Sequence, residues 1–284
     1  MILVDNSQII YSAIFSQRSF DITNENLVRH LVLNSYRHIK KKFSREYGEL
    51  VLCEEGRGLD IPWRRQFFPL YKSARRTIKK ENPDMWNRFY EIMGEIRSEV
   101  SEFFPYKSIS VPGCEADDVI FVLTKTYHDS EPILIISGDK DFGQLQIYDG
   151  VKQYSPLQKK FIDISNAKSC LFEHIIRGDS SDGVPNIFSD DDCFIVEDKR
   201  QVPVTKKKLS EIESVWVKTG KVPESLAEKW NRNETLISHL CIPQQYQDRI
   251  LEQWSNAPSQ NRSKILGYMI SKGMKNLMSD IGDF

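Results

Sequence analysis

Short apolar runs rich in β-branched residues alternate with long segments of helical periodicity, and this alternation constrains the fold more than any other feature of the sequence. The clearest runs are residues 1–4, 50–53, 108–111 and 133–136, and residues 151–154 form a weaker fifth. Continuous apolar runs of this length are typical of strands buried on both faces. We therefore expect an α/β fold with a mostly parallel central sheet flanked by helices.

Two helices are predicted between these strands. Leu27, Leu31, Ser35 and His38 fall on one face of the first. The second is expected to begin at Asn82, because asparagine is a good N-cap and the proline that follows suits the first helical position. Apolar residues then recur at spacings of three and four up to residue 103.

The pattern changes after about residue 163, where strand-like runs stop. Short helices are expected at 210–218, 224–230 and 259–278, and the irregular stretch 190–204 reads as a loop. We predict an α/β domain over residues 1–165 and a helical domain over residues 166–284.

Composition excludes several classes of protein. With 40% hydrophobic and 28% charged residues in 284, the chain is typical of a folded globular protein. No run approaches 18 apolar residues, so no membrane association is expected. Five scattered cysteines without a CxxC pair argue against a disulfide framework and a zinc site. With no signal-like start, a cytoplasmic location is expected.

Charge is unevenly distributed although the net charge is only −1. The segment 57–80 holds one acid and eight basic residues: Arg57, Arg64, Arg65, Lys72, Arg75, Arg76, Lys79 and Lys80. A basic tract set apart from acidic motifs can hold a polyanion while the acids hold metal ions.

Acidic residues follow four of the predicted strands directly or after a short turn. They are Asp5, then Glu54 and Glu55, then Glu115, Asp117 and Asp118, and finally Asp139 and Asp141. The carboxyl ends of parallel strands lie at one edge of a sheet, so these side chains are expected to meet in one crevice. Lys140 interrupts the series, and we expect its side chain to point away in an extended turn.

Carboxylates that lie close together repel one another, so their negative charge has to be neutralised by cations. At ~4 Å and an effective dielectric near 20, each like-charged pair costs about 4 kcal/mol. Oxygen-only ligands favour Mg²⁺ or Mn²⁺, and two such ions form an apparatus for hydrolysing phosphodiesters. Taken singly, the acids of 115–118 are equally consistent with an acidic first helical turn, and Asp139 with a capped tight turn.

The motifs in combination resemble those of the structure-specific 5′-nucleases, which include flap endonucleases and the 5′-nuclease domains of bacterial DNA polymerase I. They are Gly-Cys-Glu-Ala-Asp-Asp at 113–118, Ser-Gly-Asp-Lys-Asp-Phe at 137–142 and Gly-Asp-Ser-Ser-Asp-Gly-Val-Pro at 178–185. Further likeness, including Arg-His-Leu-Val-Leu-Asn-Ser at 29–35, points to the T-even-type phage ribonuclease H branch. The resemblance covers nearly the whole chain.

The resemblance implies two magnesium sites. Around the first it places Asp5, Glu55, Asp117 and Asp139, with Glu115 nearby. For the second it implies Asp141 and Asp182, with Asp179 and Asp118 acting directly or through water.

The resemblance also implies contacts with nucleic acid. The motif around Asp179 resembles a helix–three-turn–helix-like hairpin that grips duplex backbone, with Gly178, Gly183 and Val184 expected at the phosphates. Residues 57–82 correspond to the arch through which a 5′ single strand passes. There Lys72 and Arg75 resemble a basic pair that polarises the scissile phosphate. The remaining expected arch contacts are Tyr71, counted with the catalytic residues, Phe68 for base stacking, and Arg64, Arg65, Arg76 and Lys79.

Three positions depart from the family pattern. Glu55 stands where the family usually has aspartate, and we choose it over Glu54 because Gly56 preserves the acid-glycine pairing. After residue 187 the family's Gly-x-Gly is missing and three aspartates follow, which argues against a potassium-assisted duplex grip. Pro69 interrupts the basic segment, so a helix there is expected to kink or start late.

The activity implied by the resemblance is 5′→3′ exonuclease and flap or fork cleavage of DNA and RNA–DNA duplexes, with removal of RNA primers in phage lagging-strand replication. Single-strand-binding protein and sliding clamp are implied partners, and the protein is expected to be a monomer. A small-molecule magnesium phosphatase and a non-catalytic DNA-binding protein are alternatives. The five histidines are scattered, and none is expected to bind metal or catalyse.

Overall fold

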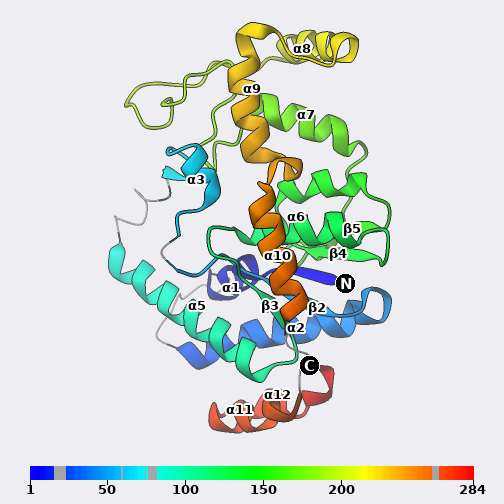
Figure 1. Ribbon diagram of the computed structural model, residues 1–284. Coiled ribbons are helices and arrows are strands. Elements are labelled where there is room, and N and C mark those ends of the chain that lie inside the picture. The colour runs from blue at the N-terminus through cyan, green and yellow to red at the C-terminus, as the bar shows by residue number, and fades with distance from the viewer. Residues whose placement is uncertain (16–23, 59, 74, 76–81, 258–261) are drawn as a thin grey trace.

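A six-stranded sheet forms the centre of the computed structural model, which describes residues 1–15, 24–58, 60–73, 75, 82–257 and 262–284 (Figure 1). The strand order is β3-β2-β1-β4-β5-β6, and every neighbouring pair is parallel except β5 and β6. The strands are β1 (Ile2–Asp5), β2 (Leu50–Cys53), β3 (Lys107–Ile109), β4 (Ile133–Ile136), β5 (Val151–Ser155) and β6 (Lys160–Ile162). The expected α/β fold with a mostly parallel sheet is confirmed.

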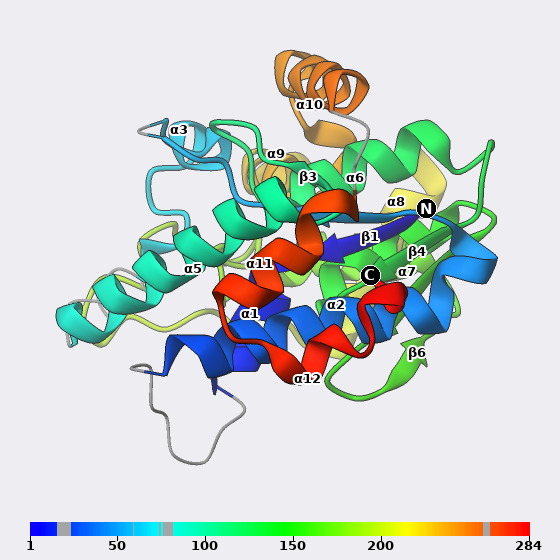
Figure 2. The same ribbon diagram turned by 90° about the horizontal axis from the view of Figure 1, so that it is seen from below.

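Strand alternation divides the apolar side chains between two layers of helices. Even-numbered residues of β1 and β2 pack on α1 (Asn6–Phe15), α2 (Glu25–Tyr47) and α5 (Pro83–Phe103). Odd-numbered residues pack on α6 (Ala116–Tyr127) and α10 (Gln244–Asn256). Figure 2 shows the sheet between the two layers.

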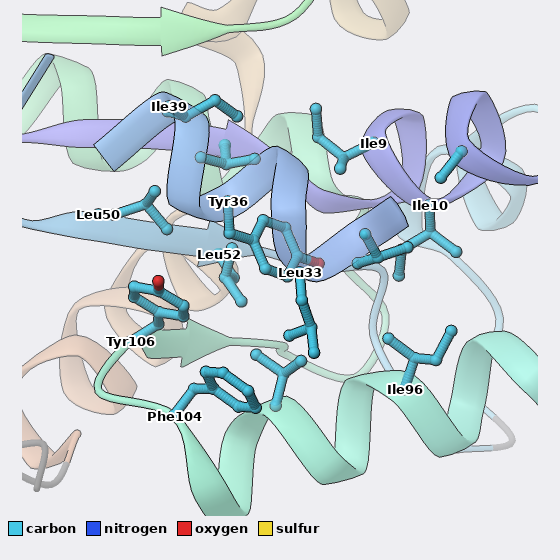
Figure 3. Close-up of a cluster of buried hydrophobic side chains, with 14 of the residues drawn as sticks. Ile9, Ile10, Leu33, Tyr36, Ile39, Leu50, Leu52, Ile96, Phe104 and Tyr106 are labelled. Carbon is cyan, nitrogen blue, oxygen red and sulfur yellow. The ribbon is translucent and has the colours of Figure 1, made fainter. Parts of the chain in front are cut away.

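The larger core joins sheet and helices around Tyr36, whose side chain is fully buried beside Tyr106 and Leu52 (Figure 3). This position corrects the predicted face of that helix. The buried face carries Val28, Val32, Tyr36 and Ile39, whereas Leu27 is exposed. Helical spacing alone fits both faces, because Leu27 and Leu31 are apolar too.

Several element boundaries differ from the sequence-based expectation. Helix α1 and strand β6 were not predicted, and β3 ends at Ile109, because residues 110–113 turn toward α6. Helix α5 begins as expected, with the Asn82 side chain accepting a hydrogen bond from the Met85 amide. The region predicted as one helix over 259–278 contains α11 (Ile265–Ser271) and α12 (Lys275–Met278), and residues 258–261 lie outside the described residues.

The second half of the chain is helical, as expected. Helices α7 (Ala167–Arg177), α8 (Lys206–Thr219) and α9 (Glu224–Ile237) form a third core with Phe68 and Tyr71, which lie in the turn after α3 (Trp63–Phe67). Helices α11 and α12 return to the sheet domain, where the C-terminal Phe284 is fully buried against Phe104. No described helix has the length and apolar character needed to span a membrane.

Candidate active site

Four strand ends bring acidic residues to one edge of the sheet. Asp5 is the last residue of β1, Glu55 follows β2, Asp117 lies in the first turn of α6 after β3, and Asp139 follows β4 after a Ser-Gly turn. A cavity of about 370 Å³ lies at this edge. Seven of the predicted carboxylates line it: Asp5, Glu55, Asp117, Asp139, Asp141, Asp179 and Asp182.

The adjacent acids Glu54 and Glu55 face different surroundings. Glu54 is 1% exposed and accepts hydrogen bonds from Asn6 at 2.9 Å and Arg57 at 3.2 Å. Glu55 faces the cavity, as the acid-glycine pairing predicted. A Cβ atom at Gly56 would lie 2.2 Å from the carbonyl oxygen of Val111, so only glycine permits this close approach of the two loops.

Glu115 and Asp118 serve the start of α6 and do not line this cavity. Glu115 is 5% exposed; its Oε2 atom accepts hydrogen bonds from Arg64 and the Tyr71 hydroxyl, both at 3.0 Å. Asp118 is fully buried, forms an ion pair with Arg64 at 2.7 Å and accepts bonds from Trp63 and the Glu115 amide. The geometry argues against the predicted role of Asp118 at a metal, because its Oδ2 atom accepts the capping bonds and its Oδ1 atom is paired with Arg64.

Asp139 combines a capping role with its position in the cavity. Its Oδ1 accepts a hydrogen bond at 3.0 Å from the Asp141 amide, at the start of the 3-10 helix η1 (Lys140–Ile147). The expected extended turn at Lys140 is wrong: the helical turn directs its Nζ to within 3.0 Å of Asp179 Oδ2.

Asp179 and Asp182 lie on a tight turn after α7. The turn is closed by two backbone hydrogen bonds between Asp179 and Val184, at 2.8 and 2.7 Å. The Asp179 carboxylate accepts bonds from the Ser181 amide and hydroxyl. Asp182 Oδ2 accepts a bond from the Tyr71 hydroxyl at 2.9 Å.

Gly178, Gly183 and Val184 are not placed to contact phosphates, contrary to expectation. Val184 is 1% exposed within the third core. At Gly178, φ is +66° and a Cβ would lie 2.3 Å from Val184 O. The amides of Gly183 and Val184 already donate to Ser180 and Asp179. These residues therefore shape the turn and do not offer their amides to a ligand.

No helix follows this turn directly, and the loop predicted over residues 190–204 is confirmed. Residues 185–205 contain turns and bends only, and α8 starts at Lys206. Two of the three aspartates at 190–192 pair with Lys199, and Asp191 pairs with Arg232. A regular helix–three-turn–helix is therefore not formed within the described residues.

His174 was missed by sequence reasoning. From α7 its Nε2 lies 3.3 Å from Asp179 Oδ2 and its Nδ1 lies 3.6 Å from Asp141 Oδ1. One ligand atom from each of these three residues lies within 4.8 Å of the others. The only available signal was its place one helical turn before Gly178, and that becomes meaningful once η1 and α7 are known to pack together.

Some residues of the basic segment are buried in the protein, and others line the acidic cavity. Arg64 is 3% exposed and bound to acids and to Leu236 O, so its predicted nucleic-acid contact is wrong. Phe68 and Tyr71 are also buried, which removes them as stacking surfaces, although the Tyr71 hydroxyl reaches Glu115 and Asp182. The predicted contacts Arg76 and Lys79 lie outside the described residues.

Lys72 and Arg75 carry positive charge to the acids. Lys72 Nζ lies 2.6 Å from Glu115 Oε1, and Arg75 Nη2 lies 2.5 Å from Asp182 Oδ1. Both residues line the cavity of the seven acids, together with Tyr11 from α1.

The pKa values of these acids are shifted mainly by burial, and secondly by neighbouring charges. Burial raises the pKa of Asp5 to about 6, and burial with repulsion from Glu115 raises the pKa of Glu55 to about 7. Burial and Asp139 raise the pKa of Asp141 to about 7. Burial opposes ionisation of Glu115 too, but Lys72 and Arg64 lower its pKa to about 2.

These features fit divalent cations. The buried Oδ1 atom of Asp141 has no hydrogen-bond partner within the described residues. Burial, with repulsion from neighbouring carboxylates, raises the pKa values of Asp5, Glu55 and Asp141, and a bound divalent cation would offset both effects. Carboxylate oxygens are the ligands that hard divalent cations prefer.

Comparison with known proteins covers the whole chain. Residues 1–172 match the family model of the 5'-3' exonuclease, N-terminal resolvase-like domain, and residues 165–284 match that of T4 RNase H, C terminal. The ribonuclease H of Enterobacteria phage T4 is 31% identical over 291 residues, spanning 99% of this chain and 95% of that protein. A 5'-3' exonuclease of Mycoplasmopsis pulmonis (strain UAB CTIP) is 27% identical, spanning 66% of this chain and 61% of that protein.

Solved structures of a phage T5 enzyme share the fold. The T5 5'-exonuclease with bound zinc has a TM-score of 0.65 and 15% identity, covering 90% of this chain and 98% of that one. The bacteriophage T5 flap endonuclease in a complex with DNA and metal ions has a TM-score of 0.64 and 15% identity, covering 90% and 96%. At this identity the likeness concerns the fold alone.

Proposed function

Since the chain belongs to the 5'-3' exonuclease family, as its motifs predicted, we propose that it is a magnesium-dependent 5′→3′ exonuclease that also cuts flaps and forks. Its substrates are DNA and RNA–DNA duplexes. Its proposed role is the removal of RNA primers during phage lagging-strand synthesis in the host cytoplasm. Single-strand-binding protein and a sliding clamp are its proposed replication partners, and it acts as a monomer.

One observation carries the proposal: seven carboxylates share a single cavity of about 370 Å³ with two basic side chains, Lys72 and Arg75. Acids alone favour cations, and basic groups alone favour phosphate. Their presence in one cavity suits a phosphodiester bound next to metal ions.

The carboxylates divide into two proposed metal sites. Asp5, Glu55, Asp117 and Asp139 would hold the first ion. Asp141, Asp179 and Asp182 would hold the second, with His174 beside them. When bound, two Mg²⁺ ions lower the pKa of an attacking water and offset charge on the phosphate oxygens.

The basic side chains orient the substrate. The Lys72 side chain lies between two carboxylates. Its Nζ atom pairs with Glu115 and is 3.5 Å from Asp182 Oδ2. Arg75 is half exposed at the cavity, where its guanidinium group can bind an oxygen of the phosphate that is cleaved or of the next phosphate along the strand. The Tyr71 hydroxyl, bonded to Glu115 and Asp182, keeps these acids in place.

Cleavage of a 5′-labelled RNA–DNA duplex tests the proposal. The protein should release 5′-phosphorylated products with Mg²⁺ and none with EDTA. Asp117→Asn removes a cavity carboxylate and should abolish cleavage while duplex binding persists. Binding should weaken steeply with salt, because phosphate contacts dominate it.

Asp118→Asn is the matched control, because Asp118 pairs with Arg64 and caps α6 and does not line the acidic cavity. It should lower thermal stability and leave the metal dependence of cleavage unchanged. Hydrolysis of a small phosphomonoester in place of the duplex would favour the phosphatase alternative. Undiminished cleavage by Asp117→Asn would remove the metal assignment.

A further inference from the structure

A buried chain of hydrogen bonds joins the ends of β1 and β2 at the sheet edge that carries the acidic cavity. The Tyr36 hydroxyl of α2 donates to Asn6 Oδ1, and Asn6 Nδ2 donates to Glu54 Oε1 at 2.9 Å. Asn6 and Tyr36 are fully buried, and Glu54 is 1% exposed. Burial of a carboxylate and an amide costs desolvation free energy that apolar side chains of similar size avoid. Stability alone therefore does not account for this chain.

The Asn6–Glu54 bond lies directly next to two carboxylates of the first metal site. The parallel pairing of β1 and β2 ends at Asp5 and Cys53, so Asn6 and Glu54 form the next pair beyond the strands. Asn6 follows Asp5 in the chain, and Glu54 precedes Glu55. A bond between the two side chains therefore fixes the distance between the strand ends that bring Asp5 and Glu55 to the cavity.

Glu54 also pairs with two arginines. Arg57 Nη2 donates to its Oε2 at 3.2 Å, and Arg97 Nε of α5 lies 3.9 Å from the same oxygen. Arg97 is buried and donates to Ser7 Oγ at the cavity wall at 2.7 Å. Neither arginine forms an ion pair with Glu55 in the described part of the chain. The charge of Glu54 thus compensates cations that would otherwise compete with a metal ion for Glu55.

We propose that Asn6 and Glu54 are positioning residues of the first metal site. Asn6 sets the spacing of Asp5 and Glu55, and Glu54 holds the arginines, which leaves the Glu55 carboxylate for a divalent cation. Neither Asn6 nor Glu54 lines the acidic cavity, so both act through their neighbours in the chain. The inference rests on the proposed nuclease function, because that function supplies the metal ion.

Titration with Mn²⁺ followed by electron paramagnetic resonance tests the inference without cleavage. The wild type should bind two ions. Glu54→Gln keeps the size of the side chain and removes its charge, and Asn6→Leu removes both hydrogen bonds. Each variant should weaken one Mn²⁺ site about 10- to 100-fold, the usual effect of losing a side chain that orients a metal ligand, and leave the other unchanged. The Mg²⁺ concentration for half-maximal cleavage should rise by a similar factor.

The controls separate positioning from stability. Glu99→Gln, on α5, removes the charge of another carboxylate that pairs with basic residues, Arg29 and Lys272, and does not line the acidic cavity. It should lower the melting temperature and leave both Mn²⁺ sites unchanged. If Asn6→Leu does not fold, Glu54→Gln serves, since it preserves the shape of the side chain.

A double variant tests whether the two residues act together. Asn6→Leu combined with Glu54→Gln should lose no more Mn²⁺ affinity than the weaker-binding single variant, because both changes remove the same bond. Wild-type affinity at both sites in each single variant would overturn the inference and leave the proposed function intact. Equal weakening of both sites would also overturn it, because it would show a general loss of structure. A wild type that binds no Mn²⁺ and cuts no nucleic acid would instead refute the proposed function.

Discussion

Lys72 Nζ lies 2.6 Å from Glu115 Oε1, so a cation of the basic segment 57–80 is fixed against the start of α6. The backbone contributes to this position: Lys72 has φ +54°, a region that residues other than glycine rarely adopt, and its amide donates to Asp182 O at 2.7 Å. Backbone in such a conformation is held by its surroundings. The two contacts therefore hold the ammonium group at the acidic cavity, between Glu115 and Asp182.

Replacing Lys72 with alanine should reduce single-turnover cleavage about 100- to 1,000-fold, because a positioned charge that stabilises the transition state is lost. Duplex affinity in EDTA should change much less. Lys218→Ala, on exposed α8, is the matched control. Turnover near that of the wild type would remove Lys72 from catalysis.

Replacing His174 with alanine should weaken binding at the second metal site about 10- to 100-fold, since side chains that orient metal ligands typically contribute this much. The imidazole contacts both Asp141 and Asp179. Titration with Mn²⁺ followed by electron paramagnetic resonance measures the affinity directly. His38→Ala, at an exposed position of α2, should leave both sites unchanged, and equal titrations of the two variants would contradict the assignment.

Stabilisation by Mg²⁺ should grow as pH rises from about 5.5 to 8. The pKa values of Glu55 and Asp141, both raised to about 7, mean that the folded protein binds protons that the unfolded chain has released. The stability from these protonated groups is present below their ordinary pKa and is lost as pH rises through about 7. Mg²⁺ binds the ionised carboxylates, so the stability that it adds increases over the same pH range.

The measurement is the difference in melting temperature with Mg²⁺ and with EDTA at each pH. Taking this difference cancels groups far from the site, such as His239, whose pKa burial lowers to about 4. Asp141→Asn should flatten the dependence. A difference independent of pH in the wild type would show that these carboxylates do not bind the ion.

Truncating Phe284 to alanine should destabilise the fold by about 3–5 kcal/mol, as expected for a buried phenylalanine. Its ring is fully buried near Phe104, so this side chain is part of the larger core. Urea denaturation measures the loss. Ile270→Ala, at a side chain 59% exposed, should change stability by less than about 0.5 kcal/mol, and matching midpoints for both variants would refute the structural role.

Local sequence signals predicted much of the fold and the acidic edge. Apolar runs indicated β1, β2, β4 and β5, and a parallel sheet then required the acids after them to converge. The choice of Glu55 over Glu54 also followed from local pattern, since Gly56 preserves the acid-glycine pairing and alternate residues of an extended chain face opposite ways.

The roles of buried polar residues could not be predicted in this way. Arg64 and Phe68 look like surface residues of a basic arch, yet the third core covers them. Asp118 looks like a third ligand, yet Arg64 and Trp63 take its oxygens. His174 becomes part of the site only because α7 packs against η1.

The sequence by itself determined the alternation of strands and helices and the placement of acids at strand ends, because both depend on periodicity within short segments. Only the tertiary structure decided which of the charged side chains face the cavity and which are buried in ion pairs. Those outcomes depend on packing between segments far apart in the chain, which no local pattern encodes.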